Sequence, residues 1–144
     1  MIDAAAATGI KQVVFTSILD IEEGSRFYYT PVYRDAERRL TESGLNCAIL
    51  RCGLYSNLLL SHWIEPARAT GELCLPVGQA RVAPVSRKDV AAAAAALTVA
   101  ADRNGKVYEL TGPRAYSFDE IAGLAGEHFG RLRQSDPIRL LFPK

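Results

Sequence analysis

The chain has 144 residues, of which 49% are hydrophobic and 23% are charged, and its formal net charge is +1. This length suits a single hydrophobic core, and the composition is ordinary for a globular protein. The charge gives no electrostatic reason to expect binding to nucleic acid or to an anionic membrane. The longest apolar stretch, residues 90–101, is interrupted by Thr98, so no membrane-spanning helix is expected.

The cysteines indicate a reducing compartment. Cys47, Cys52 and Cys74 show neither the Cys-x-x-Cys spacing nor a Cys/His pattern of a metal site. We therefore expect no metal and no disulfide framework. The opening residues 1–7 lack the basic segment and the apolar run of a signal peptide, and together these features predict a cytoplasmic protein.

The first third of the chain alternates between helix and strand patterns. Residues 4–7 predict a short helix that ends at Gly9. The β-branched and aromatic run 12–17 is typical of a strand buried on both faces, and the polar residues 18–29 predict a loop. A helix is expected over 30–43, with Thr30 as its N-cap and Pro31 in the first position, and it should stop at Gly44.

Beyond the next buried strand, 46–51, the pattern is looser. We expect a helix over 57–64, a strand over 72–75 and an extended piece over 81–85. Two capping boxes then follow: Ser86 with Asp89 opens an alanine-rich helix over 87–101, and Ser117 with Glu120 opens a helix that ends near 130. Between them lies a strand over 107–111. The alternation predicts an α/β fold in which strands 12–17, 46–51 and 107–111 share one parallel sheet, with helix 30–43 packed on it.

Five strings in unbroken order resemble one family, the NmrA-like branch of the atypical short-chain dehydrogenases. They are Gly9–Ser17, Glu37–Leu45, Leu50–Tyr55, Pro84–Val90 and Gly105–Gly112, and the resemblance covers about residues 1–133. The bacterial NAD(P)H:quinone oxidoreductases and the triphenylmethane dye reductases are its nearest members. The resemblance implies a Rossmann-like parallel sheet with a small substrate-side α/β segment. It divides a single domain, 1–144, into later Rossmann elements (1–53) and a substrate-side segment with a returning strand and helices (54–144).

The family resemblance also implies a function. The expected activity is transfer of a hydride from NADPH or NADH to a quinone-like or aromatic small molecule. No glycine-rich phosphate turn follows a strand in this sequence, because Gly123 and Gly126 lie inside a predicted helix. We therefore expect an incomplete Rossmann-like domain with weak dinucleotide binding. The alternatives are a non-catalytic dinucleotide sensor or interaction module, and a degenerate fragment that binds nothing well and is marked by an exposed apolar sheet edge. Such an edge could also join copies of the chain into a homo-oligomer.

The resemblance assigns the expected binding residues to the carboxyl ends of strands, where open parallel sheets bind ligands. The coenzyme would contact Thr16, Ser17, Cys52, Gly53, Val85, Ser86, Arg87 and Asp89, and the acceptor would contact Leu54, Tyr55, Asn57 and Trp63. Most have a structural alternative. Thr16 and Ser17 would then cap a turn, Ser86 and Asp89 would cap a helix with Arg87 as a surface charge, and Trp63 would pack in the core or at its rim. Residues 52–55 would form a tight turn with Tyr55 as a lid over the core, and Cys52, where the family has Asn, would point into the core beside Ile49.

No catalytic residue is assigned. The typical dehydrogenases use Tyr-x-x-x-Lys on one helix face, and here the residue four positions after Tyr33 is Glu37. A carboxylate at this position disfavours the tyrosinate form. Tyr33 shares a helix stripe with Ala36 and Leu40, so packing is the favoured role. His62 and His128 have no nucleophile or carboxylate patterned around them.

Overall fold

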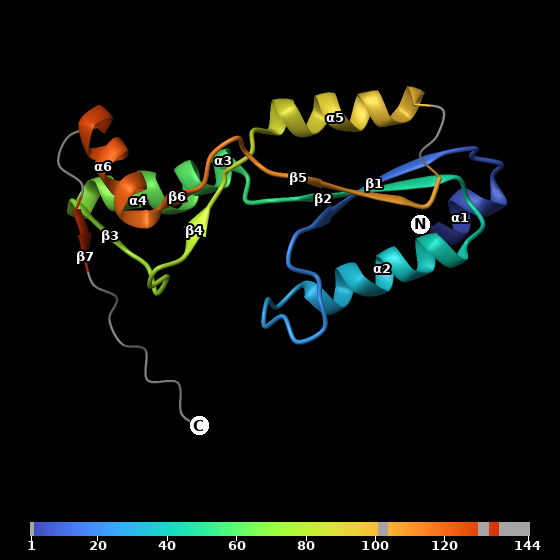
Figure 1. Cartoon of the computed structure of the whole chain (residues 1–144), viewed down its shortest axis with the longest axis horizontal. Helices are drawn as coiled ribbons and strands as arrows, with labels where there is room; N and C mark the ends of the chain where they lie inside the picture. The colour runs from blue at the N-terminus through green and yellow to red at the C-terminus, as the bar shows by residue number, and fades with distance from the viewer. Residues whose placement is uncertain (1, 101–103, 130–132, 136–144) are drawn as a thin grey trace. The chain divides into compact units, whose positions relative to one another are not determined.

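The computed structural model describes residues 2–100, 104–129 and 133–135, which fall into two compact units (Figure 1). Unit 1 takes its residues from 1–53 and 87–111, and unit 2 from 54–86 and 112–144. The chain therefore leaves unit 1 after Gly53 and returns to it at Arg87. The expected single domain, with 54–144 as its second part, stays a prediction.

Unit 1 is built on a three-stranded parallel sheet. Its strands β1 (Val13–Ile18), β2 (Cys47–Cys52) and β5 (Lys106–Leu110) lie in the order β1-β2-β5. Ser17 lies opposite Arg51 in the register, and Arg51 lies opposite Glu109. The apolar runs form strands here because both faces of β2 are covered. Five of the six residues of β2, all except Arg51, are buried. The predicted parallel sheet is confirmed.

Helices α2 (Thr30–Glu42) and α5 (Arg87–Val99) cover the two faces of this sheet (Figure 1). Successive residues of a strand point to opposite faces. Cys47 and Ile49 of β2 pack against Leu40 of α2, which is 1% exposed. A short helix, α1 (Ile2–Ala7), precedes β1. Helix α2 ends where predicted, because Gly44 adopts the left-handed backbone (φ +74°) that stops a helix.

The start of α2 corrects one prediction. Thr30 is the first helical residue and not the N-cap, so Pro31 takes the second position and not the first. Tyr29 occupies the cap position with helical backbone angles and makes no side-chain cap. The Thr30 hydroxyl instead lies 3.1 Å from the hydroxyl of Ser25, so it is engaged with the preceding loop and not with the first helical N–H groups.

Unit 2 consists mainly of a continuous helical segment, residues 56–70, that packs against helix α6 (Phe118–Phe129). Helix α3 (Ser56–Leu58) continues into a wider π-type turn, η1 (Leu59–Ile64), and then into α4 (Glu65–Thr70), so the predicted helix 57–64 is confirmed and extends further. Pro66 cannot donate a backbone hydrogen bond, which accounts for the widened turn before it. Helix α6 shares an apolar core with this segment, formed by Leu59, Ile64, Ala67, Leu73, Phe118, Ile121, Ala122 and Ala125.

Two small sheets complete unit 2. Strand β3 (Glu72–Cys74) pairs in parallel with β7 (Arg133–Ser135), and β4 (Arg81–Val82) pairs antiparallel with β6 (Tyr116–Ser117). A close backbone approach lies beside the second pair, since the Gly112 N–H donates to the Ala83 carbonyl. A side chain at position 112 would bring its Cβ within 2.1 Å of the Pro84 carbonyl oxygen, so only glycine fits.

The second predicted capping box is present at the start of α6. The Glu120 N–H donates to the Ser117 hydroxyl (3.1 Å), and the Ser117 N–H donates to the Glu120 carboxylate (2.7 Å). This backbone donor, with Arg81 and Arg114, holds the pKa of Glu120 below its ordinary value against an opposing effect of burial. Because the folded pKa is lowered, this stabilisation is complete above the ordinary carboxyl pKa and is lost as the pH falls through the lowered value.

We predict that Ser117→Ala lowers the free energy of unfolding by about 1 kcal/mol, because the first turn of α6 loses its side-chain acceptor. Urea unfolding measures the change. The exposed Ser61, whose hydroxyl contacts only the His62 ring among the described residues, supplies the control. Ser61→Ala should stay within about 0.5 kcal/mol, and equal losses in the two variants would show that the box contributes nothing specific.

Candidate functional site

The carboxyl ends of the three parallel strands meet at one edge of unit 1. Two backbone hydrogen bonds tie together the residues that follow them. The Leu19 N–H donates to the Cys52 carbonyl (3.1 Å), and the Gly53 N–H donates to the Leu110 carbonyl (2.9 Å). Open α/β sheets bind their ligands outside this end of the strands. We define the carboxyl edge as residues 17–19, 52–53 and 110–111.

Ser17 is the polar side chain buried at this edge. It is 3% exposed, and its hydroxyl has no hydrogen-bond partner among the residues that the structure describes. A buried hydroxyl without a partner costs about 1–3 kcal/mol. Thr16, the other hydroxyl predicted to meet the coenzyme, is exposed. The two therefore differ in environment, as neighbouring residues on opposite faces of a strand do.

Cys52 belongs to the sheet and not to the loop beyond it. The sequence places the end of the strand at Arg51, but β2 continues through Cys52, which is 4% exposed. Its thiol donates to the Leu50 carbonyl at a sulfur–oxygen distance of 3.5 Å. Cys52 is therefore buried, as in the packing alternative, but the alternation of side chains along β2 puts it on the face opposite Ile49 and not beside it. Gly53, the next residue, is half-buried, and a Cβ there would lie 3.4 Å from Leu19 and 3.5 Å from Thr111.

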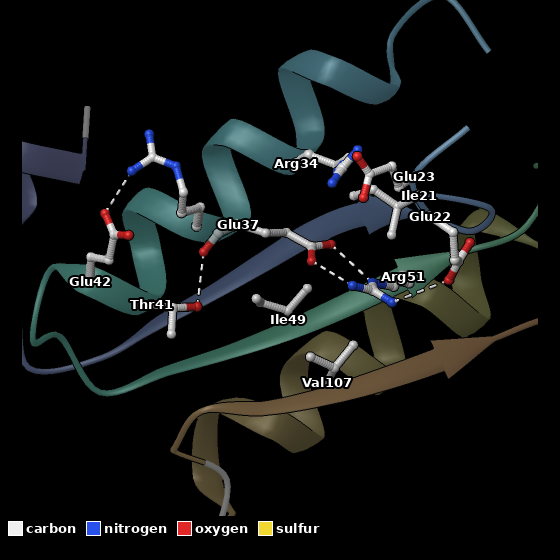
Figure 2. Close-up of a pocket in the computed structure, with 11 residues that line it drawn as sticks. Ile21, Glu22, Glu23, Arg34, Glu37, Thr41, Glu42, Ile49, Arg51 and Val107 are labelled. Atoms are coloured by element: carbon white, nitrogen blue, oxygen red, sulfur yellow. Dashed lines mark hydrogen bonds and ion pairs between the residues drawn. The ribbon is translucent and has the colours of Figure 1, made fainter. Parts of the chain in front are cut away.

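An ion pair joins α2 to β2 beside this edge. Figure 2 shows the Arg51 guanidinium facing the Glu37 carboxylate, with nitrogen–oxygen distances of 3.1 and 2.8 Å, and Glu22 at 3.9 Å. Glu37 is 8% exposed. The hydrogen bond that Arg51 donates to Glu37 raises the pKa of Arg51 above its ordinary value, against the effect of burial. The pair borders a cavity of about 440 Å³, lined by Ile21, Glu22, Glu23, Arg34, Glu37, Arg38, Thr41, Glu42, Ile49, Arg51 and Val107.

The ion pair also bears on Tyr33, because it engages the residue four positions after that tyrosine. The Glu37 carboxylate accepts hydrogen bonds from Arg51 of β2. The Tyr33 ring is half-buried and lies 6.3 Å from the ring of Phe15 in β1. Packing against the sheet, the role favoured from the sequence, accounts for the partial burial of Tyr33 and for its contact with Phe15.

Sequence reasoning missed this pair, although two signals mark it. Glu37 falls on the stripe of α2 that carries Tyr33, Ala36 and Leu40, so an acid lies on the face turned to the sheet. Arg51 continues the series Cys47, Ile49, Arg51 on the face of β2 turned to α2. When two adjacent elements each carry a charged residue of opposite sign on the faces that meet, the two residues are expected to form an ion pair.

The remaining predicted residues lie in two places. Tyr55 and Val85 form an isolated parallel bridge in unit 2, where the Val85 N–H donates to Leu54 and the Ser56 N–H donates to Val85, each at 2.9 Å. Val85 is 1% exposed and Ser86 is half-buried. Arg87 and Asp89 are exposed in the first turn of α5, in unit 1. The structure therefore brings Ser17, Cys52 and Gly53 together, and separately Leu54, Tyr55 and Val85.

Two predicted acceptor residues have defined surroundings in unit 2. Trp63 packs with the core, its ring 5.9 Å from that of Phe118, as in the packing alternative. Asn57 is half-buried, and its side-chain oxygen is buried without a partner among the described residues. Unit 2 has a cavity of its own, of about 430 Å³, with a mainly apolar lining. It is formed by Ser56, Leu59, Leu60, Ile64, Pro84, Tyr116, Ile121, Leu124, Ala125, His128 and Phe129.

Comparison with known proteins supplies relatives. No protein-family model matches the chain. Quinone oxidoreductase 2 of Escherichia coli is 32% identical over 131 residues, which cover 91% of this chain and 45% of that protein. The chain spans about half the length of the curated relatives it matches. None of the helices described in the structure is both long and apolar enough to cross a membrane.

Solved structures of the same group of reductases also match the chain. An NADPH complex of an NADPH-dependent quinone oxidoreductase from Escherichia coli matches with a TM-score of 0.84 and 31% identity, over 94% of this chain and 47% of that one. The NADP(H) complex of triphenylmethane reductase from Citrobacter sp. matches with a TM-score of 0.83 and 24% identity, over 95% and 48% of the two chains, and shows the fold. The resemblance to this family and the Rossmann-like fold are confirmed.

We predict that Arg51→Met lowers the free energy of unfolding by about 3 kcal/mol, because the buried Glu37 carboxylate loses its cation. Chemical unfolding measures this loss. Arg38→Met is the control. Arg38 pairs with Asp35 and Glu42 on the exposed side of the same helix, so its loss should be far smaller. The double variant Glu37→Leu/Arg51→Met should recover most of the stability, and failure to recover would mean that the residues act separately.

Proposed function

We propose that this chain, a relative of the NAD(P)H-dependent quinone oxidoreductases and triphenylmethane reductases, carries the nicotinamide side of an NAD(P)H-dependent oxidoreductase site. The observation that carries the proposal is the buried Ser17 hydroxyl without a partner, at the carboxyl end of β1. A polar group that costs stability in the absence of a ligand is explained if a ligand supplies its partner. The relatives' NADPH and NADP(H) complexes indicate a nicotinamide coenzyme as that ligand.

The residues at the carboxyl edge suit the carboxamide of a nicotinamide ring. A serine hydroxyl both donates and accepts a hydrogen bond, and a carboxamide offers an acceptor oxygen and a donor nitrogen. The nearby backbone N–H groups of Leu19 and Gly53 already donate to protein carbonyls, so the hydroxyl is the group left for recognition. Because Ser17 is almost fully covered, this contact requires a local opening of its cover.

When bound, the coenzyme supplies the hydride, and the protein supplies orientation and exclusion of water. The side chains of this unit include no Tyr-Lys pair on α2, and the carboxylate that follows Tyr33 is occupied by Arg51. We infer that the proton needed after hydride transfer comes from solvent. The ion pair holds α2 against β2 beside the edge, so it acts in positioning and not in the chemical step.

The proposed acceptor is a quinone-like or aromatic small molecule. The Escherichia coli relative is named for quinone reduction, and another relative, from Xenophilus azovorans, is an azoreductase. The bridge at Tyr55 and the unpartnered Asn57 oxygen support a role for the segment that follows β2. The coenzyme contacts of Thr16, Gly53, Val85, Ser86, Arg87 and Asp89, and the acceptor contacts of Leu54 and Trp63, stay predictions. A cytoplasmic location belongs to this proposal, supported by three reduced cysteines.

Ser17→Ala tests the proposal. The variant should bind NADPH about 2- to 12-fold more weakly, the effect of one net hydrogen bond. Its melting temperature should stay the same or rise, because an unsatisfied hydroxyl has been removed. Calorimetric titration and thermal melts measure the two quantities. Ser43→Ala, whose hydroxyl donates to Leu40 at the far end of α2, is the matched control and should leave NADPH affinity unchanged.

The outcomes separate the candidate functions. Unchanged NADPH affinity in Ser17→Ala would remove Ser17 from the site. NADPH binding by the parent chain with turnover of a simple quinone supports an oxidoreductase, and binding without turnover supports a dinucleotide sensor. Absence of binding at millimolar NADPH would contradict both.

Cys52→Asn tests the neighbouring position. The Cys52 side chain is 4% exposed, so the larger amide should be left without enough partners. We predict that the variant lowers the free energy of unfolding by about 1–3 kcal/mol and does not tighten NADPH binding. Tighter binding with unchanged stability would instead mean that position 52 reaches the carboxamide.

A further inference from the structure

Three consecutive aromatic side chains stand exposed on the loop between β1 and α2. Phe27, Tyr28 and Tyr29 are 52%, 84% and 54% exposed. Their rings contact each other edge to face: the centroids of Phe27 and Tyr29 lie 5.8 Å apart, and those of Tyr28 and Tyr29 lie 5.1 Å apart. We call these three residues the aromatic cluster. Sequence reasoning treated them as part of a polar loop and assigned them no role.

The loop backbone holds the cluster in a defined conformation. The Phe27 N–H donates to the Ser25 hydroxyl (3.3 Å), which in turn lies 3.1 Å from the Thr30 hydroxyl. The Thr30 N–H donates to the Phe27 carbonyl at 3.0 Å. These bonds form a tight turn directly before α2. The rings are therefore presented by an ordered turn at the start of a helix, which lowers the entropy lost when a ligand stacks on them.

Exposed aromatic surface of this extent marks a contact site. The other aromatic side chains of unit 1, Phe15, Tyr33 and Tyr108, are half-buried, and the rings of Phe15 and Tyr33 lie 6.3 Å apart. Two cavities adjoin this loop and α2: the one beside the ion pair of Glu37 with Arg51, and another of about 450 Å³ between the loop and the first half of α2. Both are lined mostly by charged and polar side chains, among them Glu22, Arg34 and Arg38. A planar apolar molecule is poorly matched to those linings. Within unit 1, the aromatic cluster is the exposed aromatic surface that matches it.

We propose that the aromatic cluster is the stacking surface for the planar aromatic or quinone acceptor. The inference rests on the proposed function, since it takes the acceptor class from there. The cluster lies at the end of the loop that begins at Leu19, directly after β1, so a single loop connects the strand that carries Ser17 to the aromatic cluster. An electron-poor quinone ring stacks favourably on the electron-rich faces of tyrosine rings.

Tyr28→Leu keeps an apolar side chain and removes the most exposed ring, and Tyr28→Phe keeps the ring. With 2-methyl-1,4-naphthoquinone as probe, Tyr28→Leu should raise the dissociation constant about three- to tenfold, the effect of one aromatic contact. Tyr28→Phe should leave it within about twofold. Val32→Ser is the control, because Val32 is 66% exposed on the first turn of α2, close in sequence to the cluster, but carries no ring. Quinone binding is measured by calorimetry without coenzyme, and NADPH binding in parallel.

The outcomes distinguish this inference from the proposed function. Weaker quinone binding with unchanged NADPH affinity supports the cluster, whether or not the chain turns the quinone over. Equal quinone affinity in Tyr28→Leu and the parent overturns it. Loss of self-association in sedimentation, with quinone affinity unchanged, would make the cluster a contact between copies and would also overturn it. Nuclear Overhauser contacts between the quinone and tyrosine rings of the parent chain decide the question if the variant is unstable.

Discussion

The pairing of β2 with β1 on one side and β5 on the other is the constraint on which the site depends. Parallel pairing brings three carboxyl ends to one edge, and the bonds from Leu19 to Cys52 and from Gly53 to Leu110 extend that pairing past the strands. The segments leaving the edge therefore start from fixed positions. One of them leads to the aromatic cluster, and the buried hydroxyl at the edge is that of Ser17.

Much of this fold could be predicted from the sequence, because its signals are local. Buried strands appear as continuous apolar runs, and the Ser117–Glu120 box is a four-residue pattern that the structure reproduces. The errors also have local causes. Thr30 has the right residue type for a cap, but its hydroxyl is taken by Ser25, and β2 gains Cys52 through pairing with Ile18 and Leu110. A sequence pattern cannot show which hydrogen-bond or strand partner a residue acquires, because the chain brings these partners together only when it folds.

The site was less predictable than the fold. Position relative to the strand ends identified Ser17, but not that its hydroxyl lacks a partner, since burial depends on every neighbouring element. The ion pair of Glu37 with Arg51 joins residues 14 positions apart, on elements that meet only in the folded sheet. The exposure of Phe27, Tyr28 and Tyr29 follows from the turn that Ser25 and Thr30 form, which periodicity cannot reveal because loops have none.

The central claim is that the carboxyl edge of unit 1 receives the nicotinamide. Backbone hydrogen–deuterium exchange, with and without millimolar NADPH, tests it most directly. The account predicts slower exchange in the segments around 17–21, 52–55 and 110–112, since a bound ring restrains the strand ends and suppresses the opening that exposes Ser17. Protection confined to other segments, such as helix α6, with these three unchanged, would contradict the account.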